Sequence, residues 1–134
     1  MFQKLAWVFG GVFLIVGVLG FVPGAISHNL LLGIFEVDSL QNIIHLLSGL
    51  IAIGAAWGSG EYARLYFRAF GVVYAIIAVI GFLQGSSVLG IFAVNMADNL
   101  FHLIIAVAAL WIGFGMKESV SARVDAASSA PSGI

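Results

Sequence analysis

The stretch Gly33–Leu47, GIFEVDSLQNIIHLL, returns 57 residues later as Gly90–Ile104, GIFAVNMADNLFHLI. Both copies keep a Gly-Ile-Phe run and an Asn followed three residues later by a His. A second similarity precedes each copy, because GGVFLIVGVLGFVPG at Gly10–Gly24 aligns with GVVYAIIAVIGFLQG at Gly71–Gly85. Apolar residues match easily by chance in membrane segments, but the Asn and His matches do not. The sequence therefore predicts a duplicated unit.

The composition predicts a protein whose surroundings are lipid. The chain of 134 residues is 62% hydrophobic and 8% charged, with a mean hydropathy of +1.15. Soluble domains are about half apolar and about a quarter charged. The absence of cysteine excludes disulfides and thiolate metal sites. A net charge of −1 without a basic run predicts no nucleic-acid partner.

Four apolar runs have the length that a helix needs to cross about 30 Å of hydrocarbon. These runs are Leu5–Val22, Leu40–Trp57, Ala69–Leu83 and Ala97–Phe114. The third can begin near Leu65, because an arginine side chain at a helix end reaches the headgroups. We predict an all-α, integral membrane four-helix bundle over residues 1–116 and a disordered cytoplasmic tail over residues 117–134.

The basic residues predict the orientation in a cell (inner) membrane. None of them falls in the segments Pro23–Ser39 and Gly85–Met96. The positive-inside rule then places both termini in the cytoplasm and these two segments outside. The basic residues are Lys4, Arg64, Arg68, Lys117 and Arg123.

Each predicted unit contains two spans, at about residues 5–58 and 65–115. Because two is an even number, both copies enter from the same side, as two parallel two-helix repeats about an axis along the membrane normal. A residue near that axis then faces its copy. The first outer loop is longer by four residues, and the insertion is predicted to include His28 and Asn29.

Glycines four residues apart recur at the outer ends of spans one and three, at Gly20 and Gly24 and at Gly81 and Gly85. This spacing favours close packing of helices in lipid. We predict packing within the chain, while a homo-oligomer or a membrane protein partner stays open.

Two polar pairs predict where spans two and four begin. Asp38 precedes Gln41 by three residues, and Asn95 precedes Asp98 by three. This is the spacing of a helix N-cap and its third residue, so the helices should start at about Ser39 and Met96.

Asn42 with His45, and Asn99 with His102, lie deeper in the same spans, and each pair shares one helix face. Polar groups within membrane helices are costly and point into the bundle. The leading interpretation is an interhelical polar network in a structural or accessory protein without a cofactor. One alternative is ligation of haem b or a metal ion by the two histidines, and the other is transport of a proton or small solute. No catalytic motif is present, so an enzyme is not predicted.

The duplicated GIFxV(D/N)…NxxHL pattern after a glycine-rich span resembles a bacterial family of small four-helix multipass membrane proteins catalogued as a domain of unknown function. The resemblance covers about residues 1–116. It implies an inner-membrane location and four helices, and it supplies no activity, ligand or catalytic residue.

Overall fold

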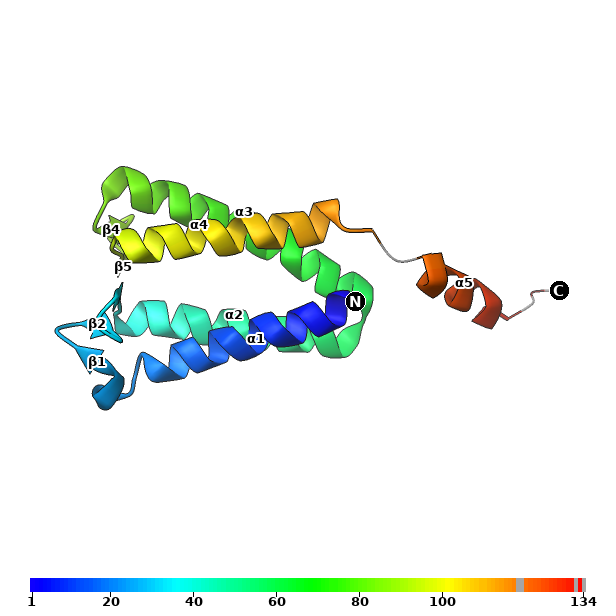
Figure 1. The fold of residues 1–134 in the computed structure, drawn as a ribbon, viewed down its shortest axis with the longest axis horizontal. Helices are drawn as coiled ribbons and strands as arrows, with labels where there is room; N and C mark the ends of the chain where they lie inside the picture. Colours follow the sequence, from blue (N-terminus) through cyan, green and yellow to red (C-terminus); the bar gives the residue numbers. More distant parts are fainter. Residues whose placement is uncertain (118–119, 132, 134) are drawn as a thin grey trace.

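The computed structural model describes residues 1–117, 120–131 and 133. Its body is built from four long helices (Figure 1), each long and apolar enough to cross a membrane. The predicted all-α class with four spans is therefore confirmed, and the chain is consistent with a multipass membrane protein. The helices are α1 (Phe2–Leu19), α2 (Ser39–Gly58), α3 (Gly60–Gln84) and α4 (Met96–Leu110), and the last continues as a π-helical turn, η2 (Trp111–Gly115).

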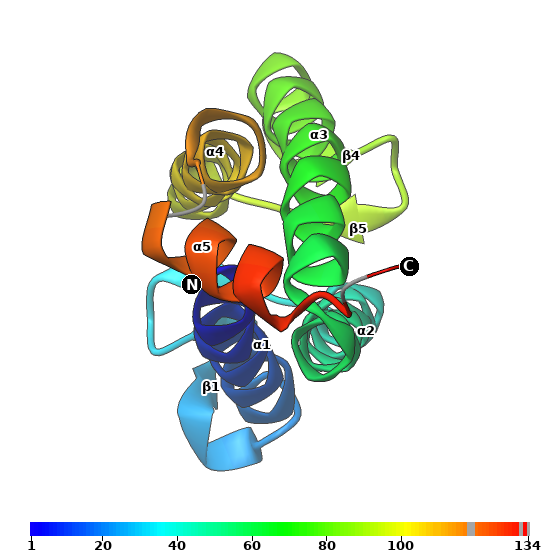
Figure 2. The same cartoon turned by 90° about the vertical axis from the view of Figure 1, so that its right-hand side faces the viewer.

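The four helices form two antiparallel hairpins. α1 packs along α2 and α3 packs along α4, whereas contacts between the hairpins are fewer and involve mainly α3. Figure 2 shows this arrangement from the end. α3 begins earlier than the sequence predicted, because the hydroxyl of Ser59 caps it by accepting a hydrogen bond from the Tyr62 backbone N–H (3.1 Å). A single residue, Ser59, thus joins α2 to α3.

Short strands close the opposite end of the bundle from the N-terminus, and we call this the sheet end (Figure 1). A 3₁₀ turn, η1 (Pro23–Ala25), leads into a three-stranded antiparallel sheet, and a two-stranded hairpin precedes α4. The strands are β1 (Ile26–Ser27), β2 (Leu30–Leu31), β3 (Phe35–Glu36), β4 (Ser87–Val88) and β5 (Phe92–Ala93).

Left-handed residues make the turns between these strands. His28 and Asn29, with φ of 52° and 63°, form the two-residue turn from β1 to β2, as in a type I′ hairpin. The β2–β3 and β4–β5 turns each contain a Leu-Gly pair with positive φ, Leu32–Gly33 and Leu89–Gly90. Strand β1 and this turn together have no counterpart in the two-stranded hairpin, so the first loop is the longer one.

The half of the bundle away from the sheet end has an aromatic and alanine core. Alanines allow close approach of the helices, and phenylalanines meet edge to face, for example Phe9 and Phe67 with ring centroids 5.0 Å apart. The buried cluster is Phe2, Ala6, Phe13, Ala52, Ala56, Ala63, Tyr66, Phe67, Phe70, Tyr74, Ile105, Ala106, Ala109 and Ile112.

Two arginines of α3 satisfy the carbonyls that the end of α4 leaves free. The Nε atoms of Arg64 and Arg68 donate to the Gly113 carbonyl at 3.0 and 2.8 Å, and Arg64 also donates to the Met116 carbonyl at 3.2 Å. These contacts fix the end of α4 against the start of α3.

The C-terminal segment contains a further helix, α5 (Val120–Ser129), which lies beyond the bundle in Figure 1. The sequence predicts disorder over residues 117–134, whereas residues 120–129 form this helix. Alanine has the strongest helix propensity, and three alanines fall within α5.

Candidate functional site at the sheet end

The predicted N-caps start α2 and α4 at the sheet end. The Oδ1 of Asp38 accepts a hydrogen bond from the Gln41 backbone N–H (2.7 Å), and α2 begins at Ser39. α4 begins at Met96 with a complete capping box, in which Asn95 and Asp98 each accept from the backbone N–H of the other (3.0 and 2.9 Å). The Gln41 side chain does not return a bond to its cap and is buried instead.

The capping carboxylates also reach across to the other hairpin. The Ala93 backbone N–H, in β5, donates to Asp38 Oδ2 at 2.6 Å. The Glu36 backbone N–H, in β3, donates to Asp98 Oδ2 at 3.0 Å. Glu36 and Ala93 occupy matching positions in the two similar stretches, so the two bonds cross between the hairpins in opposite directions.

Asn95, the N-cap residue of α4, makes a third hydrogen bond between the hairpins at the sheet end. The amide Nδ2 of Asn95 donates to the Ile34 carbonyl at 2.8 Å. Sequence reasoning assigned these polar residues to capping alone. The cross-hairpin bonds were missed because they depend on how the loops fold over the helix starts.

Two of the four glycines that were predicted to pack helices, Gly20 and Gly81, lie directly against the buried asparagines. The Asn42 amide donates to the Gly20 carbonyl at 2.7 Å. A Cβ at Gly20 would overlap the Asn42 amide, and a Cβ at Gly81 would overlap the Asn99 amide. Each glycine therefore provides the space that one asparagine occupies.

Gly24 and Gly85 do not pack helices together, which corrects the prediction for them. A Cβ at either position would meet no atom within 4 Å in the described part of the chain. Gly24 lies in the η1 turn after α1 has ended. Gly85 is the C-cap of α3 with a left-handed φ of +83°, which favours glycine for its backbone rather than for its size.

The two histidines lie together at the centre of the bundle, as expected for residues that face their copies. Their ring centroids are 6.2 Å apart. Phe13 meets His45 at 5.6 Å and Tyr74 meets His102 at 5.5 Å, both with an interplanar angle of 71°. Phe13 and Tyr74 also occupy matching positions in the similar stretches. Only 8% of His45 and 3% of His102 is exposed.

Most of the buried polar atoms around the histidines have no hydrogen-bond partner within the described residues. The Asn42 bond to the Gly20 carbonyl joins α2 to the end of α1. The predicted network is otherwise absent from the described residues, because the Asn and His side chains make no hydrogen bonds with one another. An unpaired buried polar group costs about 1–3 kcal/mol. The unpartnered atoms are Gln41 Nε2 and Oε1, Asn42 Oδ1, His45 Nδ1, Asn99 Nδ2 and Oδ1, and His102 Nδ1.

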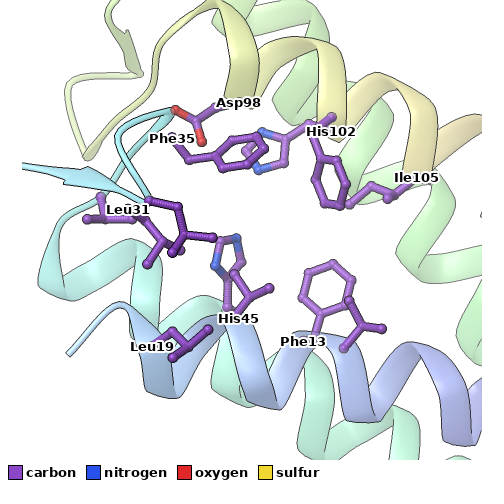
Figure 3. Close-up of a pocket in the computed structure, with 13 residues that line it drawn as sticks. Phe13, Leu19, Leu31, Phe35, His45, Asp98, His102 and Ile105 are labelled. Carbon is purple, nitrogen blue, oxygen red and sulfur yellow. The ribbon is translucent and has the colours of Figure 1, made fainter. Parts of the chain in front are cut away.

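A cavity of about 120 Å³ lies beside the histidines, between α1 and α4 (Figure 3). Phe13 and Leu19 of α1, and Ile105 of α4, form its sides, and the first loop covers it with Leu31 and Phe35. His45, His102 and Asp98 also line it. The cavity was not foreseen from the sequence, because it depends on the two hairpins leaving a gap between α1 and α4.

The family model described as "Domain of unknown function (DUF4383)" matches residues 3–115. The chain belongs to this family. The match covers the four-helix body and agrees with the resemblance drawn from the sequence. No curated protein and no solved structure matches the chain.

The site in this DUF4383 chain has few donors for a metal ion. Within the described ranges, no group of three or more His, Cys, Asp or Glu side chains is placed to hold a metal. The cavity of about 120 Å³ is close in size to an apolar cavity of about 150 Å³ that binds benzene. It has room for one six-membered ring and not for a porphyrin.

Proposed function

We propose that this DUF4383 protein is a small accessory protein of the cell membrane that acts through binding and not through catalysis. The observation that carries the proposal is the set of crossed hydrogen bonds at the sheet end. Asp38, Asn95 and Asp98 each cap a helix of one hairpin and bond the loop of the other. Such bonds join the two hairpins at the sheet end, in addition to the shared core farther along the bundle, into one unit that a partner or a ligand can recognise.

The proposal includes the parallel two-fold repeat of the two hairpins. It is supported by the matched donors Glu36 and Ala93 and by the equal angles of the Phe13–His45 and Tyr74–His102 ring pairs. Two copies related by an axis along the membrane normal would present the same faces to that axis.

We also propose that both termini lie in the cytoplasm of a bacterial cell. The starts of α1 and α3 and the end of α4 lie at the end of the bundle away from the strands (Figure 1), and Lys4, Arg64, Arg68 and Lys117 lie in or next to these segments. The strands and their turns contain no Lys or Arg. The positive-inside rule then places the sheet end outside.

Proton passage is a second candidate, favoured by one specific chain of contacts. The Tyr74 ring meets His102, its hydroxyl lies 3.0 Å from the Ser48 Oγ, and the Tyr66 hydroxyl donates to the Ser48 carbonyl at 3.2 Å. Beyond Tyr66 the described interior is apolar, mainly phenylalanine and alanine, and offers no continuing polar path among the described residues. The accessory role is therefore preferred.

Haem or metal ligation is the weaker alternative. Two facing imidazoles are the axial pair that a b-type haem uses. The cavity beside them is too small for the macrocycle, and a third metal-binding side chain is not in place within the described residues.

The experiment compares two variants that each remove a helix cap. Asp38→Ala removes a cap and a cross-hairpin bond, whereas Ser59→Ala removes a cap alone. A lost cap costs about 0.5–2 kcal/mol, so unfolding in mixed detergent should show a larger loss for Asp38→Ala. Equal losses would contradict the joining role. A proton flux in proteoliposomes that His102→Ala abolishes would favour the second candidate instead.

A further inference from the structure

We propose that the cavity between α1 and α4 binds the ring of a lipid-soluble quinone, with the imidazoles of His45 and His102 as hydrogen-bond donors to a ring carbonyl. Nothing in the accessory role requires this site. The size of the cavity, its walls, its polar groups and the position of its mouth each favour such a ring.

The size and the walls favour a single flat ring. The volume of about 120 Å³ approaches that of an apolar cavity of about 150 Å³ that takes benzene. Phe13, Phe35 and Phe101 contribute aromatic faces or edges to the wall, and aromatic side chains pack favourably against other rings. An occupant of this site is therefore planar and largely apolar.

The histidines supply the donors that such a ring with carbonyl oxygens would need. Both line the cavity (Figure 3), both are more than nine-tenths buried, and the Nδ1 of each has no partner in the described part of the chain. An imidazole carries at least one N–H in every protonation state available in a protein near neutral pH. A carbonyl oxygen has two lone pairs, so one oxygen can accept from both rings.

Asp98 selects against an anionic occupant. Its side chain lines the same cavity, and its Oδ2 already accepts the backbone N–H groups of Glu36 and Asn95. A fatty-acid carboxylate or a phosphate would meet this carboxylate without a cation to balance it. A neutral ring with carbonyl oxygens avoids that repulsion.

The mouth of the cavity faces the bilayer. Val12 of α1, Phe101 of α4 and Leu32 of the first loop line it and are exposed on the outside of the bundle. In a membrane these side chains contact lipid. A ring held by the histidines would therefore extend its isoprenoid tail into the acyl chains without crossing a polar surface.

The test is titration of the full-length protein in lipid nanodiscs with a short-tailed benzoquinone, followed by calorimetry. We expect saturable one-to-one binding, weakened about tenfold by His45→Ala or by His102→Ala, since a net hydrogen bond corresponds to about a tenfold change in affinity. Val16→Phe fills the cavity while keeping both histidines and should abolish binding. Val8→Phe places the same side chain on a lipid-facing position of α1 that is 62% exposed, and should bind as the unaltered protein does.

Three results would overturn the proposal. The first is no saturable binding to the unaltered protein, with its thermal unfolding transition intact. The second is binding that the Val16→Phe and histidine variants retain in full. The third is equal competition by an alkyl alcohol with the same tail and no ring, which would identify the occupant as a lipid chain. Because the readout is affinity and not stability, these outcomes leave the test of the joined hairpins unaffected.

Discussion

Replacement of Gly20 by alanine tests whether Asn42 needs a residue without a side chain beside it. Gly20 is the C-cap of α1 with a helical φ of −62°, so alanine introduces no backbone strain at this position. The added Cβ would overlap the Asn42 amide, which donates to the Gly20 carbonyl. The substitution therefore displaces a fully buried amide and weakens its hydrogen bond.

The size of the effect follows from two opposing contributions. Overpacking costs about 1–3 kcal/mol, and an interhelical hydrogen bond in a membrane protein contributes about 0.6 kcal/mol and at most about 1.7. Alanine in a helix gains up to about 1 kcal/mol over glycine. The net expectation is a loss of about 1–3 kcal/mol in the free energy of unfolding.

Gly11→Ala is the matched control on the same helix. A Cβ there would meet nothing within 4 Å among the described residues, so the expected change is zero or a gain of up to about 1 kcal/mol. Reversible unfolding in mixtures of a mild detergent and dodecyl sulfate measures both variants. In the double variant Gly20→Ala with Asn42→Ala the overlap disappears, so the two losses should not add. Equal stability of Gly20→Ala and Gly11→Ala would refute the reasoning.

Three further predictions concern the backbone, the orientation and the end of α4. Gly85→Ala should lose about 1–2 kcal/mol because of its left-handed φ, whereas Gly24→Ala should unfold as the unaltered protein does; similar losses would contradict this. The chain has no cysteine, so Ser87→Cys should react with an impermeant maleimide on intact cells and Ser59→Cys only after permeabilisation; the reverse pattern would invert the proposed orientation. Arg68→Ala should lose about 1–3 kcal/mol in the same unfolding assay, because it removes a charged donor from a helix-end carbonyl, and an unchanged midpoint would show that Arg64 alone suffices.

Local signals were enough to predict the four helices and the starts of α2 and α4. Length and hydropathy located four spans, since a membrane helix must satisfy its own backbone over a fixed thickness. The pairs Asp38 with Gln41 and Asn95 with Asp98 located the helix starts, because N-capping depends on residues three apart. The matched histidines predicted a facing pair, and their rings lie 6.2 Å apart.

The remaining features depend on contacts between distant segments. The bonds from Ala93 to Asp38 and from Glu36 to Asp98 join residues more than fifty positions apart, which no local pattern reports. The turns between the short strands contain leucines at positive φ, Leu32 and Leu89, a conformation that leucine rarely adopts and that propensity argues against. The cavity is likewise a property of the hairpin arrangement and not of either hairpin alone.

The joining of the two hairpins across the sheet end is the central claim, and Asn95→Ser tests it most directly. Serine caps a helix about as well as asparagine, so α4 keeps its cap, but the side chain has lost the amide that donates to the Ile34 carbonyl. The measurement is the free energy of unfolding in mixed detergent. We predict a loss of about 0.5–1.5 kcal/mol, the net value of one hydrogen bond. A stability equal to that of the unaltered protein would contradict the claim that the caps hold the hairpins together.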